Sequence, residues 1–285
     1  MNSPYVRRLR LADELRSLRA DAGLTHEQLA KRIGQSRAQI SRLENGHVVD
    51  QNDVMKILDA LDVDGDRWTR VVTIAREAGE RGWWESNRGM GERQALFANL
   101  EAGAETIREF QTTFVPGLLQ TPEFTRARVE ADRLTGPANF TAEKAIDARN
   151  GRQRMLRRPS GPEYEVVLDE VAVRRWSAPP EVMKAQLYHV SATANRNDNI
   201  TVRVLRIDAV IQSYSVARGA FSIYTFSDPS DPAIVLVDTV TEDVELHEAA
   251  EVRRYTELYE RLREAAMPPD ASLEFLIDTA KSIAS

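Results

Sequence analysis

The stretch "GQSRAQISRLENG", residues 34–46, decides how the amino-terminal part of this 285-residue chain folds. Ser36 and Gln39 have the spacing of a capping box, in which a hydroxyl and an amide side chain satisfy backbone N–H groups at the start of a helix. Ile40 and Leu43 are spaced to share one buried helical face, and an Asn-Gly pair then ends the pattern. The stretch therefore predicts a short helix that buries its aliphatic side chains and exposes its arginines.

A second capped helix lies directly before this one. Thr25 and Gln28 form another capping box, and Leu29 and Ile33 continue as an inner face until Gly34, which favours a left-handed helix end. Two capped helices separated by about three residues make a helix-turn-helix. In that motif the second helix enters the major groove of DNA.

Further helical patterns surround the helix-turn-helix. Apolar residues recur at helical spacing from Leu11 to Ala22, and again over about 52–61 and about 66–78. Glycines interrupt the periodicity after that, so we place a domain boundary near residue 80. Residues 1–80 are therefore expected to form a compact domain of five helices.

The charge of the chain is distributed unevenly. The total is -6, but residues 1–47 carry nine Lys and Arg against five Asp and Glu, whereas residues 48–80 carry four against eight. An acidic total does not argue against binding to nucleic acid, which depends on local positive charge. The basic charge is concentrated in the part that contains the predicted helix-turn-helix.

Length and composition limit the other classes of protein. The chain is long enough for two domains, and 42% hydrophobic residues suffice to fill their cores. It has no cysteine, and its four histidines have no metal-ligand spacing, so we expect no metal site and no cofactor. No signal peptide is evident, and no stretch approaches the roughly 18 apolar residues of a membrane span. We expect a cytoplasmic protein associated with the nucleoid and not with a membrane.

Residues 81–285 show helical patterns first and strand patterns later. Helices are expected over about 94–111, from the "VPGLLQTPEF" turn to about 133, and before Pro159. Four runs rich in β-branched and aromatic residues predict strands, namely "YEVVLDEV", "ITVRVLRI", "AFSIYTFS" and "AIVLVDTV". A helix separates the first two runs, and two helices close the chain. We expect an α+β domain with a small sheet covered by helices, and an α+β class for the whole chain.

The exposed face of the second helix of the helix-turn-helix contains the candidate DNA contacts. With Ile40 and Leu43 facing the core, four residues remain to face the bases: Arg37, Ala38, Ser41 and Arg42. An arginine there can donate two hydrogen bonds to guanine. Ser36, and also His26 and Gln28 in the preceding helix, are placed to contact the DNA backbone. The alternative is that both arginines are solvated charges on a packing motif.

The residues from Leu24 to Gly46 follow the pattern L-T-x-E-Q-L-A-x-R-I-G-x-S-R-x-x-I-S-R-L-E-N-G. This pattern resembles the helix-turn-helix of the xenobiotic-response-element (XRE) and Cro type. The resemblance implies a structural ion pair between Arg19 and Glu44. It also implies base contacts by Arg37, Ala38 and Arg42, and phosphate contacts by His26, Ser36 and His47.

A second resemblance covers most of the remaining chain. "VPGLLQTPE", with "GWWE", "RQRML" and "GAFSIYTF", is similar to the carboxy-terminal domain of a large actinobacterial, WhiJ-like group of such regulators. Members of this group resemble antitoxins in architecture. The resemblance implies a small acidic partner protein, encoded nearby, that binds this domain and alters DNA binding.

Four residues of the second region are candidates for ligand or partner contacts. Trp83 and Trp84 follow a glycine and either stack on a partner or anchor a loop to a core. Tyr214 and Arg218 lie in "IDAVIQSYSVARGA", where the chain departs from the group that it resembles. If that loop contributes to a pocket or a partner surface, its specificity differs from that of the group.

The pair Asp169 and Glu170 suggests acid–base chemistry, but no nucleophile, phosphate-binding loop or metal set accompanies it, so we do not expect an enzyme. We expect a transcriptional regulator that binds a palindromic operator in double-stranded DNA as a homodimer. Residues 81–285 are expected to dimerise and to regulate, either by docking a protein on an exposed apolar patch or by sensing a small-molecule effector in a pocket. An enzyme with a DNA-binding tether is a third alternative.

Overall fold

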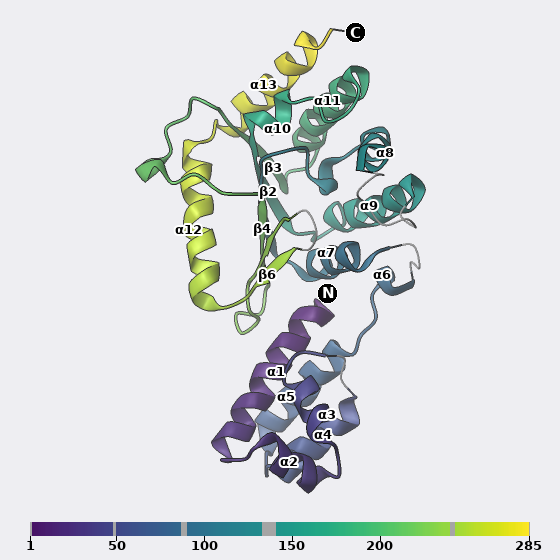
Figure 1. Cartoon of the computed structure of the whole chain (residues 1–285), viewed down its shortest axis with the longest axis vertical. Coiled ribbons are helices and arrows are strands. Elements are labelled where there is room, and N and C mark those ends of the chain that lie inside the picture. Colours follow the sequence, from purple (N-terminus) through teal and green to yellow (C-terminus); the bar gives the residue numbers. More distant parts are fainter. Residues whose placement is uncertain (1, 48–49, 87–89, 133–140, 240–242, 285) are drawn as a thin grey trace. The chain divides into compact units, whose positions relative to one another are not determined.

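The computed structural model describes residues 2–47, 50–86, 90–132, 141–239 and 243–284 (Figure 1). One compact unit contains Met1–Ser86 and Phe226–Pro232, and the other contains Asn87–Thr225 and Ala233–Ser285. The first unit is helical, and the second combines helices with a sheet, so the predicted α+β class is confirmed. The first unit extends past the predicted boundary at residue 80 and includes a segment that joins two strands of the sheet.

Five helices and a short sixth helix build the described part of the first unit. They are α1 (Pro4–Asp21), α2 (His26–Ile33), α3 (Arg37–Leu43), α4 (Gln51–Ala60), α5 (Gly65–Ala78) and α6 (Trp83–Ser86). The apolar faces of α1 to α5 share one core, which includes Leu11, Leu29, Ile40, Ile57 and Val71. The helix periodicity that the sequence predicts therefore corresponds to a single buried cluster.

Helix α1 begins seven residues before the predicted start at Leu11. Ser3 caps the helix, because its Oγ accepts a hydrogen bond from the backbone N–H of Val6 at 3.2 Å. Pro4 occupies the first helical position, where its missing N–H costs nothing. The first two turns contain three arginines, two of which are buried, so hydrophobic periodicity does not detect them.

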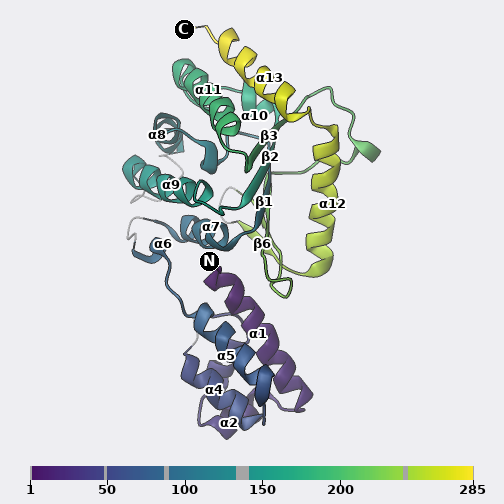
Figure 2. The same ribbon diagram turned by 180° about the vertical axis from the view of Figure 1, so that it is seen from behind.

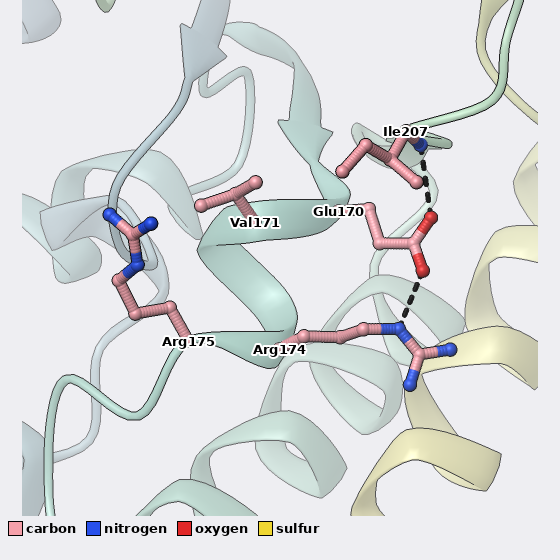
Figure 3. Close-up of a pocket in the computed structure, with 5 residues that line it drawn as sticks. All are labelled: Glu170, Val171, Arg174, Arg175 and Ile207. Atoms are coloured by element: carbon pink, nitrogen blue, oxygen red, sulfur yellow. Dashed lines mark hydrogen bonds and ion pairs between the residues drawn. The ribbon is translucent and has the colours of Figure 1, made fainter.

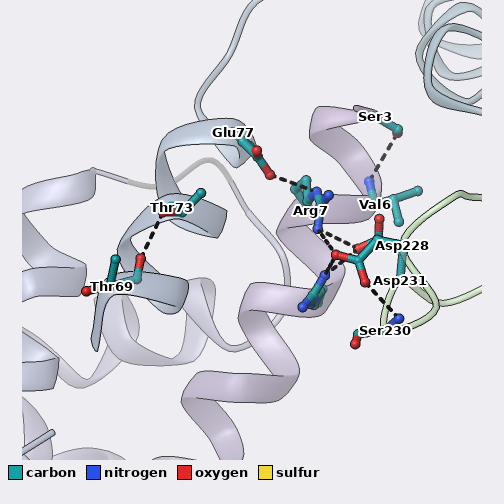
Figure 4. A network of polar contacts seen from close by, with 10 residues as sticks. Ser3, Val6, Arg7, Thr69, Thr73, Glu77, Asp228, Ser230 and Asp231 are labelled. Carbon is teal, nitrogen blue, oxygen red and sulfur yellow. Dashed lines mark hydrogen bonds and ion pairs between the residues drawn. The ribbon is translucent and has the colours of Figure 1, made fainter. Parts of the chain in front are cut away.

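The amino end of α1 carries two buried arginines, Arg7 and Arg10. Figure 4 labels Arg7 with its partners Glu77, Asp228 and Asp231. Nε of Arg7 pairs with Glu77 of α5 at 2.9 Å, and its Nη1 donates to Asp231 at 3.0 Å. Nη1 of Arg10 donates to Asp228 at 2.5 Å. This hydrogen bond is the main reason why the pKa of Asp228 lies well below its usual range. Ion pairs therefore attach the segment Phe226–Pro232 to α1.

The second unit contains a six-stranded mixed sheet in its described residues, in the order β3-β2-β1-β4-β5-β6. Its strands are β1 (Thr106–Gln111), β2 (Glu163–Asp169), β3 (Ile200–Leu205), β4 (Phe221–Thr225), β5 (Ile234–Val237) and β6 (Val244–Leu246). Strands β1, β2 and β3 are parallel, whereas β4 pairs antiparallel with β1, and β5 and β6 continue antiparallel. One half of the sheet (β1, β2 and β3) is therefore parallel and joined by crossover connections, and the other half (β4, β5 and β6) is an antiparallel meander.

Helices cover both faces of this sheet (Figure 1 and Figure 2). They are α7 (Glu92–Gly103), α8 (Pro122–Ala131), α9 (Ala142–Leu156), α10 (Glu170–Arg174), α11 (Pro180–Arg196), α12 (Ala249–Ala265) and α13 (Pro269–Ser282). Helix α12 lies on one face, over a core with Phe110, Val167, Phe221 and Leu262. Helices α7, α8, α9 and α11 lie on the other face. None of the described helices has both the length and the apolar character that a bilayer crossing requires.

The predicted helix over about 94–111 is wrong in its second half. Helix α7 ends at Gly103, and Thr106–Gln111 forms β1, an interior strand of the sheet. Ile107 and Phe110 are three residues apart, a spacing that suits a helix, whereas in the strand they lie on opposite faces of the sheet and Phe110 packs in the core under α12. Strand β6 is three residues long and was not predicted, because no run of β-branched residues marks it.

Candidate nucleic-acid interface

The turn between α2 and α3 is built by local side-chain and backbone preferences. The backbone N–H of Thr25 donates to Gln28 Oε1 at 2.8 Å, and the backbone N–H of Gln28 donates to Thr25 Oγ1 at 3.2 Å, so the predicted capping box is complete. Gly34 ends α2 with φ 68°, in the left-handed region that favours glycine. These features fix where the chain leaves α2 and enters α3.

The second predicted capping box is only half formed. Ser36 Oγ accepts a hydrogen bond from the backbone N–H of Gln39 at 3.2 Å, as expected. The Gln39 side chain does not return to Ser36, because it donates to Asp53 Oδ2 of α4 at 2.8 Å. Gln35 donates to Asp53 Oδ1, also at 2.8 Å. The buried carboxylate of Asp53 thus connects the turn and the start of α3 to α4. Both of its oxygens accept hydrogen bonds, as a buried carboxylate requires.

The two faces of α3 differ as the sequence pattern predicts. Ile40 and Leu43 are buried in the core. Arg37, Ala38 and Arg42 are exposed, and Ser41 is half-buried. Within the part of the chain that the structure describes, neither Arg37 nor Arg42 makes a hydrogen bond or an ion pair. Both guanidinium groups are therefore free to donate to a molecule outside the chain.

Arg19 and Glu44 form a two-pronged ion pair between α1 and the end of α3. Nε and Nη2 of Arg19 each approach one Glu44 carboxylate oxygen at 2.7 Å, and Nη1 donates to the backbone oxygen of Leu24 at 2.8 Å. Burial opposes the ionisation of Glu44, but Arg19 and His26 outweigh it and lower the pKa of this carboxyl. The pair therefore orients α3 and does not read bases.

The residues expected to contact phosphates have different surroundings. Nε2 of His26 lies 3.0 Å from Glu44 Oε2, so one ring nitrogen serves the ion pair. The side-chain oxygen Oε1 of Gln28 accepts the hydrogen bond of the capping box, and Ser36 Oγ accepts the hydrogen bond that caps α3. His47 is exposed. The sequence predicted the capping roles of Gln28 and Ser36, but it did not predict the contact of His26 with Glu44.

Comparison with known families assigns both parts of the chain. Residues 10–69 match a family described as a helix-turn-helix domain. Residues 94–278 match a family described as a domain of unknown function (DUF5753). The chain belongs to the DUF5753 family. No curated protein and no solved structure matches the chain significantly. The helix-turn-helix match is consistent with regulation through DNA binding.

The two tryptophans lie before the DUF5753 match, in the first compact unit. Trp84 is buried, and its ring leaves no room for a Cβ at Gly82. The Trp83 and Trp84 rings meet edge to face, with their centroids 6.1 Å apart. The burial of Trp84 is what the anchoring alternative expects, because a buried ring offers no free face to a partner.

The "VPGLLQTPE" segment, residues 115–123, forms a corner between β1 and α8 in the DUF5753 domain. Buried amides hold it: Gln120 donates to the backbone oxygen of Val115 at 2.7 Å, Gln153 to that of Gln120 at 2.8 Å, and Gln186 to that of Leu119 at 2.7 Å. Because each amide accounts for a backbone oxygen of the corner, the corner is rigidly positioned against α9 and α11.

Asp169 and Glu170 have structural partners at the start of α10. Asp169 accepts a hydrogen bond from the backbone N–H of Val171 at 2.8 Å and so caps the helix. Glu170 accepts from Arg174 Nε at 2.5 Å and from the backbone N–H of Ile207 at 3.0 Å (Figure 3). Burial opposes ionisation of Glu170, but these two hydrogen bonds prevail and lower its pKa. Glu170 lines an open cavity of about 260 Å³.

The loop from Ile207 to Val216 exposes an unusual number of apolar side chains. The exposed fractions are 77% for Ile207, 78% for Val210, 86% for Tyr214 and 71% for Val216. Ser213 and Tyr214 have φ of 60° and 53°, a conformation that residues with a Cβ rarely adopt. Strain of this kind concentrates at functional surfaces. We refer to these residues as the 207–216 loop.

Proposed function

We propose that this chain is a sequence-specific transcriptional regulator of the XRE and Cro type. The proposal rests on the different surroundings of the side chains of α3. Ser36 starts the helix, Ile40 and Leu43 bury it, and Glu44 ties it to α1, so that Arg37 and Arg42 remain exposed and without partners among the described residues. We assign base recognition to these two arginines, with Ala38 and Ser41 beside them, and no catalytic step to the chain.

The basic surroundings of α3 support the same proposal. Residues 1–47 carry the excess of positive charge, and nucleic acids bind local basic surfaces even on acidic proteins. We assign Ser36, His26, Gln28 and His47 to the sugar-phosphate backbone, since polar side chains and backbone N–H groups at helix starts commonly bind phosphate. We further propose that the protein acts in the cytoplasm, on the chromosome.

The regulator is proposed to act as a homodimer on a palindromic operator. Two copies of α3 would then enter successive major grooves about 34 Å apart, roughly one turn of the double helix. Selection of bound sequences from random duplex DNA, with the full chain, is expected to yield two inverted half-sites spaced by about one helical turn. Sedimentation of the protein–DNA complex is expected to show two chains per site. A single unrepeated half-site, or one chain per site, would contradict the dimer.

For the DUF5753 domain we propose docking of a small acidic partner protein that modulates DNA binding. The exposed apolar side chains of the 207–216 loop support a protein partner, because apolar clusters on a monomer surface mark interaction sites. Arg218, two residues after this loop, is exposed and supplies positive charge for an acidic partner.

Replacing Tyr214 by serine is expected to weaken binding of the adjacently encoded acidic protein at least about tenfold, as for a central aromatic contact. Titration calorimetry with the two purified proteins measures the affinity. Tyr188→Ser is the matched control, because Tyr188 is an exposed tyrosine on α11 of the same domain. Equal affinities for the Tyr214 and Tyr188 variants would remove the loop from the proposal.

A small-molecule effector is the second candidate mode of regulation. A specific observation favours it, namely that Nε and Nη1 of Arg149 in the DUF5753 domain are buried and make no hydrogen bond to a described residue.

A further inference from the structure

A cluster of four arginines lies in the DUF5753 domain, beside the corner of residues 115–123, close enough for the other three to act electrostatically on Arg149. Its members are Arg93 of α7, Arg128 of α8, and Arg149 and Arg152 of α9. A Cβ placed on Gly117, in the corner, would lie 3.4 Å from Nη1 of Arg152 and 3.5 Å from Nε of Arg149. Two guanidinium groups of like charge therefore converge on one glycine.

Three of these arginines have a carboxylate of their own. Their closest ion-pair distances are 2.6 Å from Arg93 to Asp243, 2.8 Å from Arg128 to Asp132, and 2.5 Å from Arg152 to Glu101. Arg152 and Glu101 are both buried, and Arg152 also donates to Gln94 Oε1 at 2.8 Å. The positions of these side chains are therefore set by contacts within the domain.

Arg149 differs from the other three arginines. Its Nε and Nη1 are shielded from solvent, and neither makes a hydrogen bond to any described residue. Burial and the positive charges of Arg152 and Arg128 lower the pKa of Arg149 to about 10, so the group stays protonated at neutral pH. Buried donors of a cation are almost always paired, because an unpaired one loses its hydration without compensation. Among the described residues Arg149 makes no ion pair, unlike the other three arginines of the cluster.

The groups around Arg149 are held in fixed positions, as expected of a binding site for an oxyanion. The corner beside it is held by the amides of Gln120, Gln153 and Gln186, and Arg152 is held by Glu101. Donors that are fixed before a ligand arrives bind it without a further ordering cost. A planar guanidinium matches the geometry of carboxylate and phosphate oxygens.

We propose that Arg149 is the anchor of an effector site, at which it binds the carboxylate or phosphate group of a small acidic molecule beside Gly117. The bound anion accepts hydrogen bonds from the Arg149 donors that otherwise lack an acceptor. The regulatory role of this site rests on the small-molecule mode of the proposed function, whereas anion binding itself does not. Its occupancy is a property of the DUF5753 domain and is measured without DNA, so failure of sequence-specific DNA binding and failure of this site are separate results.

The test compares the full chain with its Arg149→Met and Arg154→Met variants. Methionine removes the charge of Arg149 and keeps much of its volume, and Arg154 is an exposed arginine on the same helix. Thermal unfolding is measured in sodium phosphate, in sodium acetate and in sodium chloride at equal ionic strength. Because phosphate stabilises most proteins without a site, the difference between variants is the informative quantity.

The wild type and Arg154→Met are expected to gain stability in phosphate or acetate over chloride, and Arg149→Met is expected to lose this gain. Titration calorimetry with the same anion is expected to show half-saturation at least about tenfold higher for Arg149→Met, since one bidentate charge-assisted contact is removed. The anion that binds more tightly identifies the effector group. The same gain in all three proteins, or no gain in the wild type, would overturn the proposal.

A second variant covers the case in which Arg149→Met does not fold. Arg149→Lys keeps the positive charge but replaces the planar fork by a single ammonium. Weaker anion binding by the lysine variant than by the wild type supports recognition through the guanidinium. Unchanged binding by the lysine variant contradicts it.

Discussion

Replacing Glu44 by alanine is expected to lower the free energy of unfolding of the helical unit by about 3 to 5 kcal/mol. The Glu44 side chain is 4% exposed and that of Arg19 is 15% exposed, so the variant leaves a largely buried guanidinium without its carboxylate. Removal of one partner of a buried pair is far more damaging than removal of both, because the remaining charge stays desolvated. Amide hydrogen exchange of α2 and α3 in the full chain measures the opening free energy.

Glu27→Ala is the matched control for this prediction. Glu27 is an exposed glutamate in the first turn of α2, where its loss is expected to cost less than about 1 kcal/mol. The difference in unfolding free energy between Glu44→Ala and Glu27→Ala is also expected to depend on pH. Since the pKa of Glu44 is lowered by folding, its contribution is present above its unfolded pKa and is lost as pH falls through the folded value. Equal effects of Glu44→Ala and Glu27→Ala at neutral pH would contradict a structural role for the pair.

Replacing Arg37 by alanine is expected to reduce affinity for the operator by about 1 to 3 kcal/mol, or roughly tenfold to a hundredfold. Affinity for random duplex DNA at the same salt concentration is expected to change much less. The reason is that a base contact discriminates between sequences, whereas a phosphate contact weakens binding to all of them. Fluorescence anisotropy with labelled operator and with scrambled duplex measures both affinities.

Arg32→Ala is the matched control for Arg37→Ala. Arg32 is an exposed arginine in the last turn of α2, outside the face that we assign to bases. Its loss is expected to change the affinities for operator and random DNA by similar factors. Equal losses on both DNA molecules for Arg37→Ala would instead make Arg37 a phosphate contact. Loss of folding does not confuse the result, because substitution of exposed side chains without partners changes stability by less than about 0.5 kcal/mol.

Local rules predicted most of the helical unit, since its helices are marked by caps, glycines and a period near 3.6. The exposure of Arg37 and Arg42 followed from the burial of Ile40 and Leu43 on the same short helix. The bond from Gln39 to Asp53 could not be predicted in this way. Whether Gln39 turns back to the cap or across to α4 depends on a carboxylate that only the tertiary fold brings near.

The sheet was harder to predict than the helices. Strand β1 carries Arg108 and Glu109, whose polarity suits a helix, and their partners Glu260 and Tyr164 come from distant parts of the chain. The arginine cluster has the same character. Arg149 and Arg152 are three residues apart in an ordinary helical sequence. Only the tertiary positions of Asp243, Asp132 and Glu101 show that Arg149 is the member of the cluster without an ion pair to a described carboxylate.

The membership of Phe226–Pro232 in the helical unit affects the order in which this protein is made. All residues of the helical core lie between Leu11 and Ala78, so that core can assemble early in translation. Asp228 and Asp231, which pair with Arg10, are synthesised about 150 residues later, which corresponds to roughly 7 to 30 seconds on a ribosome. During that interval the nascent helical unit has Glu77 beside Arg7 but lacks Asp228 and Asp231, the acids that pair with Arg10. A fragment that ends at Ser86 would keep this deficiency permanently.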